Sequence, residues 1–170
     1  MNKYDTQGHL CDGLIYIGEV VAPDGTVLQR GEDKNLNPQS GVDYVAGLFM
    51  GTTAVISPWY VGVYEGDYTP TKAAKSSDLP IAIIESVAYS QTSRPVWDKT
   101  YDGISLITSI NSRASFTFTS DKTLFGGFVI SESAKGGNSG VLLSIVRFAT
   151  PYVIPAGSTL QLYHKQNVVA

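Results

Sequence analysis

The stretch of sequence that decides the fold is R-A-S-F-T-F-T, at residues 113–119. Apolar Ala114, Phe116 and Phe118 alternate in it with hydroxyl-bearing side chains. Successive side chains of a β-strand point to opposite faces of the sheet, so such alternation is typical of a strand with one buried and one solvated face. The segment therefore predicts a half-buried strand, and an antiparallel sheet is the natural setting for it.

Two further segments, residues 59–65 and 159–163, alternate in the same way. In the first, Trp59, Val61 and Val63 share one face of the predicted strand. Segments rich in β-branched and aromatic residues extend the count, and they lie at residues 14–22, 26–30, 81–89, 104–110, 124–131 and 141–148. The last of these is apolar on both faces, which predicts a strand in the centre of the core.

Turn residues separate these segments. Pro-Asp-Gly at residues 23–25 predicts a hairpin between the first two strands. The pair Gly126 and Gly127 indicates a bulge or a close backbone approach inside a strand. Pro95 has no N–H to donate to a sheet, which places its segment at an edge or in a connection. The glycine-rich residues 133–140 predict a flexible loop.

One segment, residues 36–51, is the best candidate for a helix. Ser40 and Asp43 resemble the start of a capping box. One predicted helical face carries Val42, Val45, Ala46 and Phe49. Gly47 costs about 1 kcal/mol relative to Ala inside a helix, so packing rather than propensity must hold the helix.

The count of about eight strands and one short helix predicts an all-β fold. A jelly-roll-like sandwich is the first choice, and an immunoglobulin-like sandwich is the alternative. Residues 1–13 are polar and without periodicity, which predicts an N-terminal arm, and residues 14–170 are then a single β-sandwich domain. Residues 71–79 could add one helical turn, which Pro80 should end.

Composition limits the classes of protein. Residues 1–85 carry 5 basic and 11 acidic side chains, a net −6, whereas residues 86–170 carry 7 and 4, a net +3. The difference is too small and diffuse for a nucleic-acid footprint. A single cysteine, Cys11, excludes an intrachain disulfide framework. The chain has neither a signal-peptide core nor an apolar run of about 20 residues, so we expect neither secretion nor a membrane span.

Catalytic and metal-binding patterns are scarce. His9, Cys11 and His164 offer no second ligand pair at zinc-site spacing, and neither histidine lies in a motif that marks a catalytic base. We expect His9 on the arm and His164 near an exposed strand end, with no metal and no cofactor. The glycines of residues 136–140 lack the Gly-Lys-Ser/Thr ending of a phosphate-binding loop.

Paired carboxylates are the remaining residues in the sequence that could act as catalytic groups. Glu65 with Asp67, or Asp98 with Asp102, could serve a glycosidase, although acids in turns are usually solvated. A glycoside hydrolase or an esterase, with these acids and His164 as nominated residues, is therefore the weakest of three functional hypotheses.

Four aromatic side chains follow one another closely: Trp59, Tyr60, Tyr64 and Tyr68. Each pairs an apolar body with a polar tip, which suits a sugar-stacking or protein-binding surface. The alternative is that about half of them belong to the core. If they are exposed, they favour a receptor- or carbohydrate-binding β module associated with a fibre or tail.

Four segments together carry a resemblance. They read S-P-W-Y-V-G-V-Y-E-G-D-Y-T-P (residues 57–70), A-Y-S-Q-T-S-R-P-V-W (residues 88–97), A-S-F-T-F-T-S-D-K-T-L-F-G-G-F (residues 114–128) and S-G-V-L-L-S-I-V-R-F (residues 139–148). In these segments the chain resembles small structural proteins of tailed bacteriophages and prophages, in particular the capsid cement or decoration proteins of short-tailed phages. The resemblance spans roughly residues 45–165.

The resemblance implies a function without catalysis. It implies a jelly-roll-like virion protein, made in the host cytoplasm, that binds the capsid exterior and stabilises the head shell. Its partner would be the major capsid protein, and the protein itself would be a homo-oligomer, with no direct contact to nucleic acid or membrane. Tyr4 and Leu10 would then be anchors in an arm that orders on binding, the alternative being a frayed tail.

Overall fold

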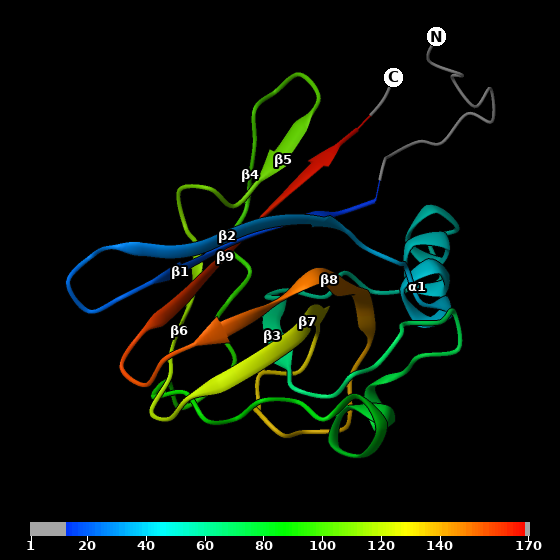
Figure 1. Ribbon diagram of the computed structural model, residues 1–170. Helices are drawn as coiled ribbons and strands as arrows, with labels where there is room; N and C mark the ends of the chain where they lie inside the picture. The colour runs from blue at the N-terminus through cyan, green and yellow to red at the C-terminus, as the bar shows by residue number, and fades with distance from the viewer. Residues whose placement is uncertain (1–12, 169–170) are drawn as a thin grey trace, which may run out of the picture.

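The computed structural model describes residues 13–168 and shows two antiparallel sheets packed face to face (Figure 1). The strands are β1 (Ile15–Val21), β2 (Val27–Lys34), β3 (Tyr60–Tyr64), β4 (Thr100–Tyr101), β5 (Leu106–Thr108), β6 (Ala114–Thr117), β7 (Lys122–Ile130), β8 (Leu142–Ile154) and β9 (Thr159–Asn167). The helical elements are α1 (Gln39–Phe49), the 3₁₀ turn η1 (Ser76–Asp78) and the π-helical turn η2 (Leu79–Ile83). This architecture confirms the predicted all-β sandwich with one short α-helix.

The larger sheet is built around β9. Its strand order is β2-β1-β9-β5-β4, and β6 also pairs with β9. The strand has room for both because β6 pairs with residues 159–162 and β5 with residues 165–167. The β4–β5 hairpin therefore continues beyond the sandwich, and it projects from the body of the molecule in Figure 1.

The smaller sheet has the order β3-β7-β8 and is covered on both faces. One face packs against the larger sheet and places Val61 and Val63 in a first core cluster. The other face places Tyr64 and Phe128 in a second cluster beneath η2. The alternation in residues 59–65 is thus confirmed, but both of its faces are buried, and the tyrosine side is core as well.

Two local predictions are confirmed in detail. In residues 113–119, Ala114, Phe116 and Phe118 are buried. A register shift follows Leu124 in β7, at the predicted bulge. A Cβ at Gly126 would lie 2.1 Å from the ring of Tyr64 and 2.1 Å from a β8 carbonyl oxygen, so only glycine fits where these strands approach.

The segment of residues 81–89, predicted as a strand, is not one. Leu79 and Ile83 are spaced as i and i+4, and both are buried in the second cluster as parts of η2. Pro80 lies in the first turn of this helix, where no N–H is needed. The helical turn predicted within residues 71–79 is present as η1, and it ends before Pro80 as predicted. The strand preference of the β-branched residues was overridden by a helical turn that buries two large side chains.

Residues 141–148, as part of β8, lie in the centre of the core as predicted: Leu142 and Ile145 belong to the second cluster, and Val146 and Phe148 belong to the first. The strand lies at an edge of the smaller sheet, because β7 is the central strand. Its outer side is covered by Leu36, which forms an isolated bridge with Ile145, and by α1, where Ser40 donates a hydrogen bond of 2.8 Å to the carbonyl of Leu142. A covered edge therefore carries an apolar sequence that resembles a central strand.

Helix α1 is shorter than predicted and is not capped by a side chain. It follows Pro38 and begins at Gln39, and the hydroxyl of Ser40 is directed to β8 instead of to the helix terminus. Its buried residues are Gly41 and Tyr44. The predicted apolar face lies elsewhere on the helix and is exposed or only partly covered.

A buried ion pair joins the irregular segments of the fold. The side chains of Arg94 and Glu85 are 0% and 1% exposed, and the guanidinium Nε and Nη2 donate to the two carboxylate oxygens over 2.8 and 2.7 Å. The same guanidinium donates to the carbonyls of Glu132 and Gly137, and the carboxylate accepts from the N–H of Gly136. The glycine-rich loop predicted at residues 133–140 is thereby anchored to the core.

Replacing Arg94 with Met should lower the free energy of unfolding by about 3–5 kcal/mol, because Glu85 and two carbonyls would stay buried without their charged donor. Urea denaturation measures the change. Lys122→Met is the matched control, because it breaks a partly exposed pair with Glu65, whose two side chains are 24% and 28% exposed, and should cost about 0–1 kcal/mol. Equal effects of the two substitutions would contradict a structural role for the buried pair.

Candidate functional site

The four aromatic residues nominated from the sequence lie at different depths. Trp59 is buried in the first core cluster, where its ring meets that of Tyr44 edge-on at 5.1 Å. Tyr64 is buried in the second cluster, and its hydroxyl donates to a β8 carbonyl. Tyr60 and Tyr68 are partly buried against the second cluster. Trp59 and Tyr64 are thus core side chains, and only the other two reach the surface.

The proposed anchors of the arm, Tyr4 and Leu10, lie outside the described residues, as do His9 and Cys11. The structure therefore places none of these four side chains.

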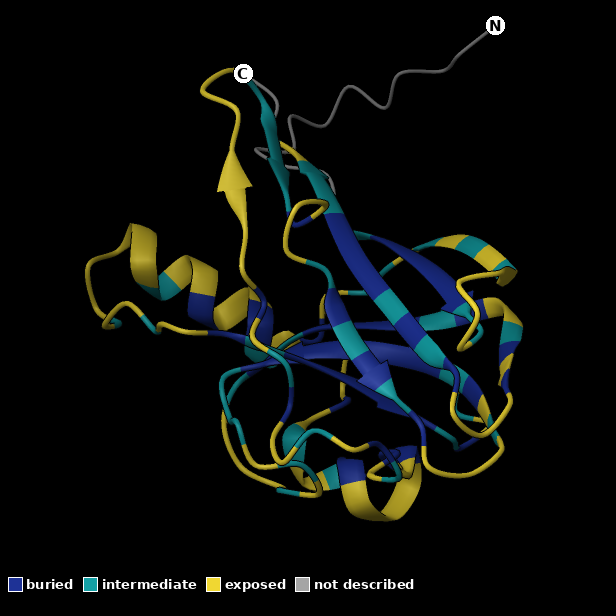
Figure 2. Cartoon of the chain, turned by 90° about the vertical axis from the view of Figure 1, so that its left-hand side faces the viewer, coloured by how far each residue is buried: buried dark blue, intermediate teal, exposed yellow. Residues whose placement is uncertain are grey.

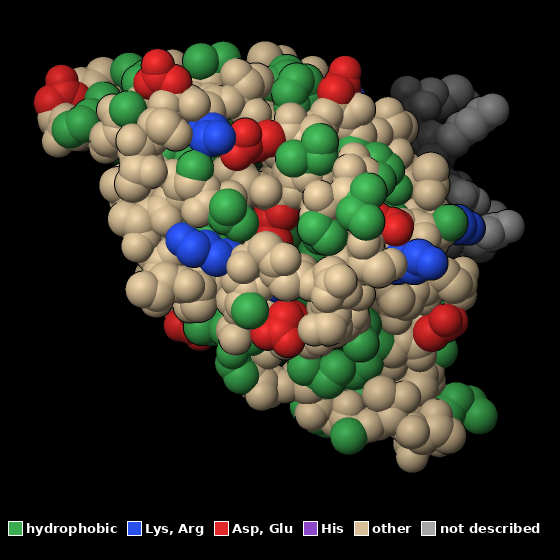
Figure 3. Space-filling view, turned by 90° about the horizontal axis from the view of Figure 1, so that it is seen from below, with side chains coloured by type: hydrophobic (Ala, Val, Ile, Leu, Met, Phe, Trp, Pro, Cys, Tyr) green, Lys and Arg blue, Asp and Glu red, His purple; other side chains and the backbone are tan. Residues whose placement is uncertain are grey.

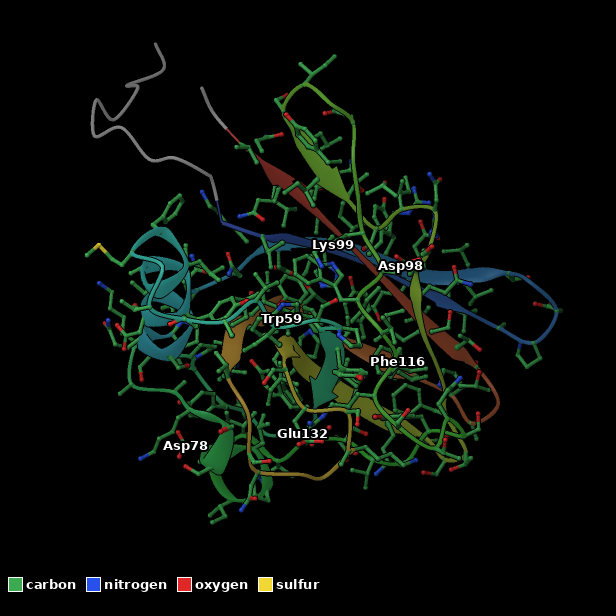
Figure 4. All side chains as sticks on the ribbon, turned by 180° about the vertical axis from the view of Figure 1, so that it is seen from behind. Trp59, Asp78, Asp98, Lys99, Phe116 and Glu132 are labelled. Carbon is green, nitrogen blue, oxygen red and sulfur yellow. The ribbon has the colours of Figure 1, made fainter. Side chains whose placement is uncertain are left out.

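The nominated acids are held in separate structural contacts. Glu65 pairs with Lys122 at 3.0 Å, and Asp67 forms an ion pair with Arg147. Asp98 is exposed on the segment that leads to β4. In Figure 4, Asp98 lies well apart from the other two labelled acids, Asp78 and Glu132. Glu65 and Asp67, nominated as a catalytic pair, are each engaged by a different basic side chain.

Asp102 has a structural task in the projecting hairpin. Its Oδ1 accepts hydrogen bonds from the N–H groups of Leu106, Ile104 and Ser105, and these bonds hold the pKa of the carboxyl below its ordinary value. The carboxylate closes the turn between β4 and β5, with Gly103 at a φ of +82°. Its Oδ1 is thus occupied by backbone donors of the hairpin.

His164 is not at an exposed strand end, as the sequence had suggested. It is 1% exposed, and burial lowers the pKa of its imidazole from 6.5 to about 3. Nδ1 lies 3.4 Å from the hydroxyl oxygen of Ser109, while the rings of Tyr16 and Trp97 contact it edge-on. The serine and the histidine meet inside the core, where a substrate does not reach them.

Residues 13–168 also contain no group of three His, Cys, Asp or Glu side chains placed to hold a metal ion. Within the same range, no helix is long and apolar enough to cross a lipid bilayer. On the face seen in Figure 3, the Lys and Arg side chains lie apart, with Asp and Glu among them, and they form no basic stripe. On this face, the distribution of charges does not suggest a nucleic-acid surface.

An apolar groove beside α1 is the feature that the sequence did not predict. It has a volume of about 390 Å³. Its helical wall consists of Gly41, Val42, Val45, Ala46 and Phe49. Four of these five form the stripe that was recognised in the sequence as one helical face. The helical periodicity of the sequence shows that these side chains share one face. It does not show that this face borders a groove and not the core.

The opposite wall comes from distant parts of the chain. Leu14 precedes β1, Asn37 precedes α1, and Leu143 and Gln166 lie on β8 and β9. Trp97 completes this wall, and its indole N–H is buried without a hydrogen-bond partner. Segments separated by more than a hundred residues therefore form one concave apolar surface.

The apolar side chains of α1 are unusually exposed to solvent. Val42 and Val45 are 45% and 38% exposed, and Phe49 and Met50 are 73% and 76% exposed. Figure 2 shows α1 standing beside the sandwich with most of its surface accessible. Exposed apolar surface next to a groove is typical of a site that binds another protein.

Comparisons with known proteins identify no relative: no protein-family model, no curated protein and no solved structure matches the chain. The α1 groove is therefore the candidate site on structural grounds alone.

The burial of His164 predicts a pH-dependent stability. In the unfolded chain the imidazole of His164 is protonated near pH 6.5, whereas in the folded chain it is protonated only near pH 3. Acid therefore favours the unfolded chain. The free energy of unfolding should be highest above pH 6.5 and should fall by about 1.4 kcal/mol for each pH unit below it. Urea denaturation between pH 6.5 and about pH 5, above the range of ordinary carboxyl groups, measures this slope.

The control is His164→Gln, which removes the imidazole but keeps a polar side chain of similar reach. Its stability should be nearly independent of pH in this interval. A slope equal to that of the native chain would show that another group is responsible.

Proposed function

We propose that this chain is a non-enzymatic structural protein of a phage head, of the capsid cement or decoration type, and that it associates with other protein subunits through the α1 groove. The observation that carries the proposal is the exposed apolar face of α1. A soluble subunit that leaves Phe49 and Met50 about three-quarters exposed beside a groove presents surface that association would bury.

The composition of the groove supports protein binding over small-molecule chemistry. Its walls are mainly aliphatic and aromatic, and the polar side chains in them are Asn37 and Gln166. Apolar centres with few charges are typical of the cores of protein interfaces. No charged side chain lines the groove to polarise or protonate a substrate.

The placement of the nominated acids and of His164 also supports a non-enzymatic function. Each nominated acid apart from Asp98 is held in an ion pair or a turn, and the buried imidazole has no carboxylate to orient it. The identity of the assembly, a head shell, follows from the resemblance to phage structural proteins. The major capsid protein is accordingly the proposed shell partner.

The proposal predicts the abundance of the protein in virions. Gel densitometry of gradient-purified particles should show a copy number comparable with that of the major capsid protein, because a cement protein covers a repeated surface lattice. Particles that lack the protein should lose their DNA at a lower temperature. A copy number as low as that of a single tail or portal ring would contradict the proposal.

A further inference from the structure

We propose that Gln29 and Asp33 of β2 form an edge cap that keeps the outer edge of β8 from pairing with a strand of another copy of this chain. The capped part of the edge is residues 149–153. The inference goes beyond the proposed function and does not depend on it, because it concerns a side of the sandwich where copies are kept apart. It rests on hydrogen bonds between side chains of β2 and the backbone of β8.

The outer edge of β8 is covered in two different ways. Over its first half the chain itself lies against the edge: Leu36 exchanges backbone hydrogen bonds of 2.8 and 3.1 Å with Ile145, and Ser40 donates to the carbonyl of Leu142. Over residues 149–153, no backbone segment within residues 13–168 forms a ladder with this edge. A bare strand edge offers its N–H and C=O groups to a strand of another molecule.

The edge cap occupies this second half. Oδ1 of Asp33 accepts a hydrogen bond of 2.9 Å from the N–H of Ala149. The amide of Gln29 donates to the carbonyl of Pro151 over 3.0 Å and accepts from the N–H of Val153 over 3.1 Å. Alternate residues of a strand direct their N–H groups to the same edge, and the proline between these two has no N–H. Both donors on this part of the edge are therefore bound.

The backbone of β2 places the edge cap over β8. Gln29, Gly31 and Asp33 alternate with exposed residues and share one face of the strand. Gly31 leaves room between the other two for Tyr152, because a Cβ there would lie 2.6 Å from the phenolic oxygen. The hydroxyl of Tyr152 donates to the carbonyl of Gly18 over 3.2 Å. β2 thus contacts β8 through side chains and not through a backbone ladder.

The sequence of the edge gives the reason for a cap. Residues 148–154 read F-A-T-P-Y-V-I and carry no charged side chain, and Val153 is 62% exposed. Uncharged segments of high β-propensity at a strand edge tend to pair with other chains, and polar groups or proline at the edge prevent the pairing. Pro151 is one such protection within the segment. Gln29 and Asp33 bring the polar groups that the segment lacks from the other sheet.

The first test removes the edge cap. Gln29→Ala combined with Asp33→Ala leaves the N–H groups of Ala149 and Val153 without acceptors. Hydrogen exchange at these two groups should become about tenfold faster in the freshly prepared double variant. On incubation the double variant should form β-rich assemblies that bind thioflavin T, whereas the native chain keeps its size in sedimentation velocity.

Two controls separate the loss of the cap from the loss of charge. Asp33→Asn removes the charge but keeps the Oδ1 acceptor, so this variant should not assemble. Glu32→Ala removes a carboxylate from the neighbouring exposed position of β2 and should behave as the native chain. Circular dichroism verifies that each variant folds. If the double variant does not fold, Asp33→Ala is compared with Asp33→Asn, and only the alanine variant should assemble.

A suppressor identifies the edge at which copies pair. The N–H of Val153 donates to Gln29 and not to β7, so Val153→Pro removes this donor without breaking the ladder between β7 and β8. Added to the double variant, it should prevent the assembly.

The outcomes decide the inference. Unchanged hydrogen exchange, a folded variant without the cap that does not assemble, an Asp33→Asn variant that does assemble, or a suppressor without effect would overturn the edge cap. None of these results changes the copy number of the protein in virions, so the proposed function stands or falls separately.

Discussion

The fold depends on one buried charge pair, Arg94 with Glu85. Two ionised groups withdrawn from water are tolerated only where nearly every donor and acceptor finds a partner. Here the guanidinium binds both carboxylate oxygens and two loop carbonyls, and the carboxylate also accepts from the N–H of Gly136. These bonds connect residues 84–97, which run along β3, with residues 131–141, the loop between β7 and β8.

The ion pair also positions a wall of the candidate site. The backbone N–H of Arg94 donates to the carbonyl of Ser133, and the carbonyl of Pro95 accepts from Val61 of β3. Two residues further on, the N–H of Trp97 donates to the carbonyl of Trp59 over 2.7 Å. Trp97 is therefore held by a connection laid along the edge of β3 and fixed at one end by a buried charge. The buried Arg94–Glu85 ion pair thus helps to position Trp97, which forms one wall of the α1 groove.

The other wall, α1, carries two different faces. Its inner face is close to β8, and a Cβ at Gly41 would lie 2.3 Å from the carbonyl oxygen of Leu143, so the helix can approach only because this residue is glycine. Tyr44 is the other buried residue of the helix, and its hydroxyl oxygen accepts a hydrogen bond from the N–H of Ile56, which holds the helix in place. The apolar stripe of Val42 and its neighbours consequently lies beside the buried face of the helix and borders the groove.

The sequence by itself determined the elements whose signal is local. The strands at residues 59–65, 113–119 and 159–163, the hairpin at residues 23–25 and the bulge at Gly126 follow from side-chain alternation and from the backbone needs of glycine and proline. Tertiary structure alone decided that residues 81–89 leave the sheets, that His164 is buried and that the α1 stripe borders a groove. The physical reason is that a periodic pattern shows which side chains share a face, whereas burial of that face depends on distant segments that cover it.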